Sequence, residues 1–404
     1  MQFEGHQNQS LVLLSAKWCA KFARVIESLH MNSPALNLII DSLEIFRVIV
    51  PLPTPLRVWG KDIIQREFVF VRVHAGDYTG TGFGLTRGMD LGSAIERQIK
   101  PLVLQQPVSA IRQVWNTARQ GARMTGDTGI FARALSLVDT ALWDLLGHVL
   151  GVPLWQMWGG AQQRVPCVAI CGYYRREDSV VGLRQEAERL LAAGYTRFKI
   201  PFGEDADLDV QRVRTLREVS GPHAMIGLDA SGIFNSCKDA VQAWRTVEAF
   251  DIAFLEDPFS AAQWELVPQL ANSTPVKIAF GESITSPLII QRLSSDMRID
   301  IVRPDATVLH GISGFLQAVA PALENGVAVF PHYYPDLHAP LAGALGLSMI
   351  EESPAEADTV GFGALRAQQP DIHDGHWHLT DRPGLGIVWD EEVLGMKGMK
   401  GVNG

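Results

Sequence analysis

The chain has 404 residues, of which 47% are hydrophobic and 20% are charged, as in an ordinary globular protein with a large core. This composition excludes a disordered, collagen-like or coiled-coil protein. The net charge of −9 at pH 7 argues against a nucleic-acid-binding surface. At about 100–200 residues per domain, the length predicts two domains, or one barrel with an appended domain.

The cysteine count and the hydropathy pattern bear on the compartment. Four cysteines, at positions 19, 167, 171 and 237, are too few and too scattered for a disulfide framework. Cys167 and Cys171 have no second pair or histidine cluster to complete a zinc site, so we interpret them as buried thiols. Free thiols fit a reducing cytoplasm, where we predict the protein to be. No run of 18 or more apolar residues occurs, so we expect no membrane span.

The N-terminal part of the chain divides into an extension and a domain. Residues 1–36 carry the short run LVLL without the positive segment of a secretory signal, and we interpret them as an N-terminal extension. In residues 37–160, the stretches IIDSLEIFRVIV and FVFVRVHAG predict strands, and PLPTPLRVWGKD between them predicts an irregular surface loop. Helices follow, and the clearest should have one apolar face formed by Ile130, Leu135, Val138, Leu142, Leu145 and Leu146. This region is therefore predicted to be an α+β domain.

The pattern changes after Pro166, where short apolar runs alternate with helical stretches. The runs are CVAIC, RFKI, AMIGLD, IAFLED, VKIAFGE, IDIVRPD, VAVFPH and LSMIEE. Such alternation indicates βα units and a parallel sheet. Seven or eight units favour a closed (β/α) barrel over an open doubly wound sheet.

Almost every apolar run ends in an ionisable residue, at intervals of 19 to 30 residues, which is about one βα unit. The seven residues are Lys199, Asp229, Glu256, Glu282, Asp305, His332 and Glu351. The carboxyl ends of barrel strands surround a single mouth, where active sites of this fold lie. A charged side chain at the end of an apolar strand is costly unless it is paired or binds something. The spacing therefore predicts one functional site.

Three carboxylates in this set, Asp229, Glu256 and Glu282, come from neighbouring strands. They repel one another unless a cation lies between them, and hard oxygen ligands favour Mg2+ over zinc or copper. Taken singly, each could instead cap the following helix.

The other members of the set suggest a base and a substrate anchor. Asp305 beside His332 would fix the imidazole tautomer and raise its basicity, which predicts a general base. Lys199, across the mouth, could hold a substrate carboxylate. A satisfied core histidine and a surface lysine are the ordinary alternatives.

Ordered motifs identify a family resemblance. They are F-K-I, G-L-D, F-L-E-D-P, A-F-G-E-S, R-P-D followed by H-G-I-S-G, F-P-H, the helix DTALWDLLGHVLGVPLWQMWGG and the terminal R-P-G-L-G-I. With these motifs, residues 37–395 resemble the enolase superfamily in its mandelate racemase subgroup. The resemblance implies a (β/α)7β modified TIM barrel over 161–360, a capping domain over 37–160 and a segment, 361–404, that returns to the capping domain. It also implies a homo-oligomer and a small-molecule carboxylate substrate.

The resemblance also implies roles for the mouth residues. The carboxylate trio matches Mg2+ ligands, and His332 with Asp305 matches a dyad that abstracts the proton α to a carboxylate. Glu351 matches the acid that hydrogen-bonds the enediolate, with the adjacent Glu352 as an alternative. We expect this acid to be protonated, and buried for that reason.

Two positions depart from the family pattern. The family commonly has K-x-K on the second barrel strand, the second lysine being a base on the opposite face, whereas this chain has Lys199-Ile200-Pro201. Proline cannot take a proton, which argues against racemisation by two bases. Ser231 replaces a frequent asparagine after the first metal ligand. One base on one face favours β-elimination, and we predict an acid-sugar dehydratase that forms a 2-keto-3-deoxy acid.

Two other functions stay open. A racemase or epimerase of an α-hydroxy acid would need a second base, for which Tyr173, Tyr174 and His338 are candidates. A sugar-acid-binding protein without catalysis is the alternative outside enzymes.

Substrate contacts are expected from three places. These are a loop over residues 51–61 with Trp59 as a lid, the stretch GYYRRED with Tyr173, Arg175 and Arg176, and His338. The arginines could bind hydroxyls or a distal carboxylate, or could simply be solvent-exposed.

Overall fold

The computed structural model describes residues 34–58, 61–160, 162–174, 179–295, 299–354 and 358–395. Three predicted substrate contacts, Trp59, Arg175 and Arg176, lie outside these ranges, as do most of the predicted N-terminal extension and Cys19. None of the helices in the described ranges is long and apolar enough to cross a membrane.

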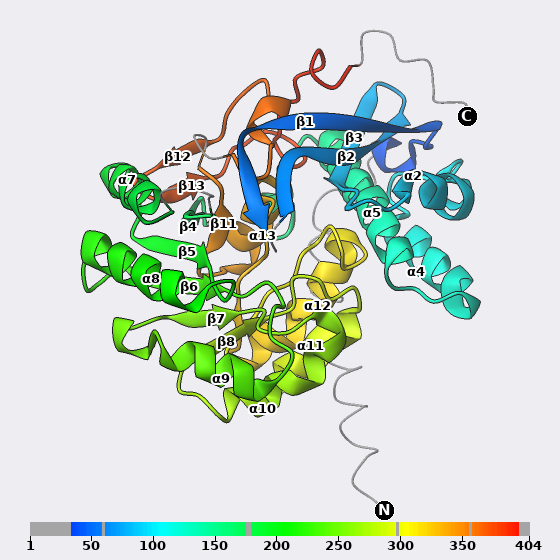
Figure 1. Cartoon of the computed structure of the whole chain (residues 1–404). Coiled ribbons are helices and arrows are strands. Elements are labelled where there is room, and N and C mark those ends of the chain that lie inside the picture. Colours follow the sequence, from blue (N-terminus) through cyan, green and yellow to red (C-terminus); the bar gives the residue numbers. More distant parts are fainter. Residues whose placement is uncertain are drawn as a thin grey trace, which may run out of the picture.

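The N-terminal domain is a three-stranded antiparallel sheet covered by helices (Figure 1). The sheet order is β1 (Ser42–Val58), β2 (Lys61–Ala75) and β3 (Tyr78–Leu85). The helices are α2 (Leu91–Ala94), α3 (Lys100–Val103), α4 (Ile111–Gly121), α5 (Ile130–Leu150) and α6 (Leu154–Met157). Helix α5 lies directly on β3. The two backbones are so close that a Cβ atom at Gly82 would come within 1.8 Å of the Leu137 carbonyl oxygen. Glycine is therefore required at this helix–sheet contact.

Two local predictions for this domain are wrong. Residues 51–58 continue β1 instead of forming an irregular loop, with a register shift between Pro51 and Leu56. Strand β1 is at the edge of its sheet, where proline is tolerated because one row of backbone groups has no strand partner. Ile130, predicted on the apolar face, is 45% exposed at the start of α5, while the other five residues of that face are buried.

The second domain is the predicted barrel, and the prediction of its fold class is confirmed. Its parallel strands are β4 (Arg164–Ile170), β5 (Arg197–Pro201), β6 (Met225–Asp229), β7 (Phe254–Glu256), β8 (Lys277–Phe280), β9 (Ile301–Val302), β10 (Ala328–Val329) and β11 (Ile350–Glu352). The connecting helices are α7 (Ser179–Ala192), α8 (Ala206–Ser220), α9 (Cys237–Arg245), α10 (Val267–Ala271), α11 (Pro287–Ser295), α12 (Gly311–Asn325) and α13 (Pro335–Leu345). Short 3-10 segments lie at Pro34–Asn37, Ala122–Met124, Glu248–Phe250, Ala261–Leu266 and Gly363–Leu365, and a π-helical segment at Ile95–Ile99.

Strand pairing runs without interruption from β10 through β9 to β4, and β11 pairs with β4. In the described part of the chain no ladder joins β10 to β11; there, the backbone N–H of Tyr333 donates to Glu351 Oε2 at 2.6 Å. An apolar cluster fills the barrel with one residue from, or next to, each of six strands: Val168, Phe254, Ala279, Ile301, Phe330 and Met349.

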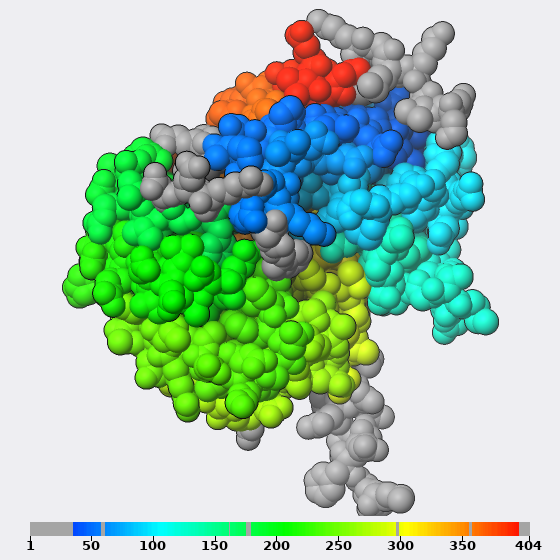
Figure 2. Space-filling model, in the orientation of Figure 1, coloured from blue at the N-terminus to red at the C-terminus, as the bar shows by residue number. Residues whose placement is uncertain are grey.

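The C-terminal segment contacts both domains. It contains the hairpin β12 (Asp371–His373) and β13 (His376–His378), and β13 pairs antiparallel with β4. Further on, the ring of Trp389 packs on Phe70 of the N-terminal sheet at 5.2 Å between centroids. The N-terminal domain therefore caps the barrel and is fixed there partly by the chain end (Figure 2).

Hydrogen bonds place this capping domain over the carboxyl ends of the barrel strands. The Leu85 N–H, at the end of β3, donates to Tyr334 Oη at 2.9 Å. The Gly129 N–H, just before α5, donates to Thr285 Oγ1 at 3.2 Å. Both acceptors follow barrel strands, so the mouth of the barrel faces the capping domain.

Candidate active site

The structure brings the three predicted carboxylates together. Asp229 and Glu256 end β6 and β7, and Glu282 follows β8. One carboxylate oxygen from each lies within 4.8 Å of the others. The Ser231 backbone N–H and hydroxyl both donate to Asp229 Oδ1 at 2.9 Å, so serine orients this carboxylate where the family often has asparagine.

The trio fits a hard divalent cation. Glu256 is fully buried, and among the described residues its Oε2 atom has no hydrogen-bond partner. Burial raises the pKa of Glu256 to about 7, against the opposing charges of Arg303 and Lys199. A buried carboxylate with an unpaired oxygen beside two further carboxylates is stabilised by a cation, and an all-oxygen set favours Mg2+.

Beside the trio lies a buried charged network that we call the floor: Lys199, Glu256, Arg303 and Glu351. The Lys199 ammonium lies 3.0 Å from Asp229 Oδ2 and 2.7 Å from Glu256 Oε1, and it also contacts Glu351. Each floor side chain is at most 3% exposed. The floor therefore holds two carboxylates against two cations out of water, where such pairing is obligatory.

Arg303 is a floor residue that the sequence analysis did not single out. Its Nη2 donates to Glu256 Oε1 at 2.9 Å and to Glu351, and its Nη1 donates to the carbonyl oxygens of Phe330 and Pro331 at 2.7 and 2.9 Å. It lies within the R-P-D motif, two residues before Asp305. Its position, a cationic residue directly after an apolar strand, could have identified it from the sequence.

The structure separates the two candidate glutamates on β11. Glu351 points into the floor, whereas Glu352 accepts a hydrogen bond from Tyr195 Oη at 2.6 Å. Burial raises the pKa of Glu351, but the charges of Arg303 and Lys199 outweigh it and hold that pKa below its ordinary value. The two cations beside Glu351 therefore favour its ionised form in this arrangement, and its protonation stays a prediction from the sequence.

His332 and Asp305 form the predicted dyad geometry. His332 Nδ1 lies 3.0 Å from Asp305 Oδ2, and the Thr307 N–H and hydroxyl donate to Asp305 Oδ1 at 2.7 and 2.8 Å. Burial lowers the pKa of His332, but Glu282 and Asp305 reverse this and raise it overall. Nε2 faces the trio, 3.2 Å from Glu282 Oε2. With Nδ1 bound to Asp305, the other ring nitrogen of His332 therefore points toward the carboxylate trio.

Tyr333 holds the base in place from its other side. Its ring stacks on His332 at 5.1 Å between centroids, and its hydroxyl accepts from Arg66 Nη2 at 3.1 Å. Tyr333 and Tyr334 have φ values of 59° and 38°, a left-handed backbone that is uncommon for aromatic residues. Strained backbone of this kind concentrates at functional sites.

His338 is not a substrate contact. Its Nε2 accepts from the Ala306 N–H at 3.1 Å, so Nδ1 carries the proton and donates to the Tyr333 carbonyl oxygen at 2.7 Å. Both ring nitrogens are satisfied inside the protein. This prediction is wrong because the residue supports the backbone around His332 instead.

The two tyrosines after β4 also have defined places. Tyr173 is half-buried, and the charges of Lys199 and Asp229 act on it, so it borders the mouth. Burial raises its pKa above the ordinary value. Tyr174 donates from its hydroxyl to Asp209 at 2.5 Å, away from the trio.

Two arginines of the capping domain, Arg87 and Arg133, form what we call the rim. The charges of Glu282 and Asp305 act on both guanidinium groups, and burial together with the charge of Arg87 lowers the pKa of Arg133. Arg87 is exposed, Arg133 is half-buried, and neither has a hydrogen bond or ion pair with a described residue.

Arg87 is held by a tight turn. It has a φ of 48°, and the Met89 N–H donates to the Thr86 carbonyl oxygen at 2.9 Å across it. The sequence analysis missed both rim residues, since they lie about 150 or more residues before Glu282 and Asp305 in the chain.

Comparison with known families identifies the class that this capped barrel defines. Residues 42–159 match the mandelate racemase/muconate lactonizing enzyme N-terminal domain, and residues 182–393 match the enolase C-terminal domain-like family. The chain belongs to the enolase superfamily, in its mandelate racemase/muconate lactonizing enzyme group. The resemblance inferred from the motifs is confirmed.

Individual relatives share most of the chain. An arabinonate dehydratase of Saccharolobus solfataricus is 28% identical over 81% of this chain and 90% of its own length. A Streptomyces coelicolor A3(2) racemase crystallised with magnesium is similar with a TM-score of 0.81 and 26% identity, covering 89% of this chain and 99% of its own. An L-talarate dehydratase of Polaromonas sp. JS666, in complex with Mg and L-glucarate, has a TM-score of 0.79 and 25% identity, covering 88% and 96%.

Proposed function

We propose that this protein removes the proton α to the carboxylate of an acid sugar and then eliminates the β-hydroxyl as water, giving a 2-keto-3-deoxy acid. Two of the relatives above carry dehydratase names. The observation that carries the proposal is the base His332, oriented by Asp305 at 3.0 Å, together with Pro201 where the family commonly has a lysine on the opposite face.

The proposed metal ligands are Asp229, Glu256 and Glu282. A Mg2+ ion bound there supplies positive charge that stabilises the enediolate formed when the α-proton leaves. The similar racemase and talarate dehydratase structures both contain magnesium.

The side chains of the mouth bind the substrate, transfer the proton and position one another. Lys199 binds the substrate carboxylate and, with Arg303, offsets the charge that develops on it; such preorganised charge is usually the largest single contribution. The Asp305 carboxylate keeps the proton of His332 on Nδ1, so Nε2 accepts the α-proton. The resulting imidazolium donates that proton to the departing β-hydroxyl. Glu351 orients Lys199 and Arg303.

The end of the second barrel strand supports elimination over racemisation. Pro201 stands where the family commonly has its second lysine, and it has no ionisable group. Tyr173 has a raised pKa, the Tyr174 hydroxyl is bound to Asp209, and His338 is satisfied within the protein. None of these three side chains is therefore suited to take a proton from the substrate at neutral pH. Racemisation remains the second candidate because of the similar racemase.

Substrate recognition is proposed at the rim. Arg87 and Arg133 present guanidinium groups that no described residue occupies, and guanidinium binds carboxylates and sugar hydroxyls in fixed geometry. The homo-oligomer and the cytoplasmic location stay predictions from the sequence.

Proton NMR in D2O with Mg2+ tests the proposal against pooled mono- and diacid sugars and α-hydroxy acids. Dehydration removes the α-proton signal and produces C3 methylene resonances. The H332N variant should leave the same pool unchanged while keeping its melting temperature.

Two results would contradict this function. Loss of the α-proton signal with an intact carbon skeleton would mean racemisation or epimerisation. Ligand binding by calorimetry without any spectral change would indicate a binding protein.

A further inference from the structure

The C-terminal hairpin β12–β13 carries an unassigned cluster of metal-ligating side chains. Its sequence is DIHDGHWH, residues 371–378, and Asp374 and Gly375 form the turn with φ values of 51° and 64°. In the antiparallel register Asp371 pairs with His378, and His373 pairs with His376. Because side chains alternate along a strand, these four residues share one face of the hairpin.

Three of the four lie at metal-binding separation. One oxygen of Asp371 and one ring nitrogen each of His373 and His378 lie within 4.8 Å of one another. His373 Nδ1 is 3.0 Å from Asp371 Oδ1, and the two imidazoles stack at 3.8 Å between centroids. The fourth, His376, turns away, since its Nδ1 contacts the Asp374 carbonyl oxygen at 2.6 Å.

One imidazole nitrogen of this cluster is shielded from solvent and has no partner among the described residues. His378 Nε2 has almost no contact with solvent and no hydrogen-bond partner in the described part of the chain. Buried polar atoms without partners are uncommon in folded proteins and call for an explanation.

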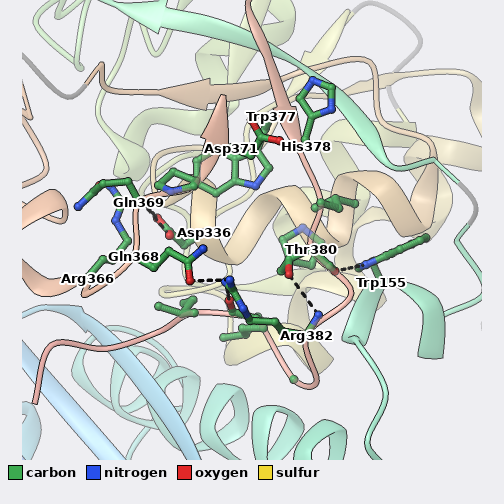
Figure 3. A pocket seen from close by; sticks show the side chains of 17 residues that line it. Trp155, Asp336, Arg366, Gln368, Gln369, Asp371, Trp377, His378, Thr380 and Arg382 are labelled. Atoms are coloured by element: carbon green, nitrogen blue, oxygen red, sulfur yellow. Dashed lines mark hydrogen bonds and ion pairs between the residues drawn. The ribbon is translucent and has the colours of Figure 1, made fainter. Parts of the chain in front are cut away.

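The cluster is separate from the barrel mouth. Asp371 and His378 border a cavity of about 290 Å³ between the C-terminal segment and helices α6 and α13, and none of the mouth residues lines it (Figure 3). The two donor sets also differ in chemistry: the mouth offers only oxygen, whereas the hairpin offers two imidazoles and one carboxylate.

We propose that Asp371, His373 and His378 bind a borderline divalent transition-metal ion, Zn2+ above all, with water completing the coordination. Imidazole nitrogen with carboxylate oxygen suits Zn2+ and not Mg2+. A metal ion lies in the plane of each imidazole that binds it, so the exposed His373 ring turns out of its stack with His378 on binding.

The ion would cross-link a structural junction. It would join β12 to β13, and β13 pairs with β4, the first barrel strand, where His378 lies opposite Arg164. Zn2+ binding would therefore stabilise the attachment of the C-terminal segment to the barrel, because a ligand that binds only the folded state raises the melting temperature.

Calorimetric titration of Zn2+ into the full-length, tag-free protein tests this, with saturating Mg2+ present to occupy the carboxylate trio. We expect one equivalent of Zn2+, a rise in melting temperature, and a visible d–d spectrum when Co2+ replaces Zn2+. Even a change beside a metal ligand typically weakens binding about 10–100-fold, so H378Q and D371N should lose at least this much.

The matched control is H376Q, which changes a histidine on the same hairpin face outside the proposed ligand set. It should bind Zn2+ with unchanged affinity. Equal weakening by H376Q and H378Q would mean non-specific surface binding and would overturn the proposal. Unchanged affinity in H378Q, or no binding by the unaltered protein, would overturn it as well.

Discussion

The floor and the rim of the mouth differ in how completely their charges are paired. In the floor, Arg303 and Lys199 are buried and each contacts two or more carboxylates. In the rim, Arg87 and Arg133 have no partner among the described residues, although the charges of two other carboxylates, Glu282 and Asp305, act on both guanidinium groups. Charge that is already satisfied is preorganised for one chemical step, whereas unsatisfied charge at an entrance is available to select a substrate.

The largest expected effect comes from the base beside the floor. H332N should lower kcat by about 10²–10⁴-fold, the contribution of a positioned general base. Turnover and α-proton exchange with D2O would both be measured, with melting temperature as the folding control. H338N should act differently: it breaks two internal hydrogen bonds and should lower stability. Exchange at the normal rate in H332N would exclude His332 as the base.

The next effect tests whether the buried ion pairs of the floor are required for the stability of the fold. R303M leaves the buried Glu256 and Glu351 without their guanidinium partner, and breaking a buried ion pair typically costs about 3–5 kcal/mol. R47M is the surface control, since Arg47 is 71% exposed in its pair with Glu67 and such pairs contribute about 0–1 kcal/mol. Denaturant unfolding would compare them, and equal losses would contradict the contrast.

A smaller effect is expected at the rim. R133M should raise KM about tenfold or more with little change in kcat, because a hydrogen bond to a charged group contributes about 1.5–3 kcal/mol. R87M should behave alike, and R123M, at a surface position on the same domain, is the control. A fall in kcat with unchanged KM would assign the rim to the chemical step instead.

The last effect concerns pH and Glu352, the neighbour of Glu351 whose side chain binds Tyr195 instead of the floor. Burial raises the pKa of Glu352 to about 7, so between about pH 4.5 and 7 the folded state retains a proton that the unfolded state has lost. Stability should therefore fall as pH rises through this window, by at most about 1.4 kcal/mol per pH unit from this group. Denaturant unfolding at several pH values should give a shallower slope for E352Q. An unchanged slope would mean that Glu352 ionises normally.

Much of the floor could be predicted from the sequence, because strand ends recur once per βα unit and a barrel gathers them at one mouth. Lys199, Glu256 and Glu351 were found this way. Arg303 was not predicted, because Asp305, the last residue of the same R-P-D motif, was taken as the ionisable residue at that strand end. The protonation state of Glu351 depends on its contacts with Arg303 and Lys199, which spacing along the chain does not contain.

Local periodicity and ordered motifs were enough to predict the family, the barrel and the residues at its strand ends. The folded structure was needed to show which of Glu351 and Glu352 faces the mouth, that His338 supports the backbone, and that the charges of Glu282 and Asp305 act on Arg87 and Arg133. The physical reason is that burial and electrostatic pairing depend on distances between side chains remote in sequence, and these distances exist only once the capping domain and the barrel pack together.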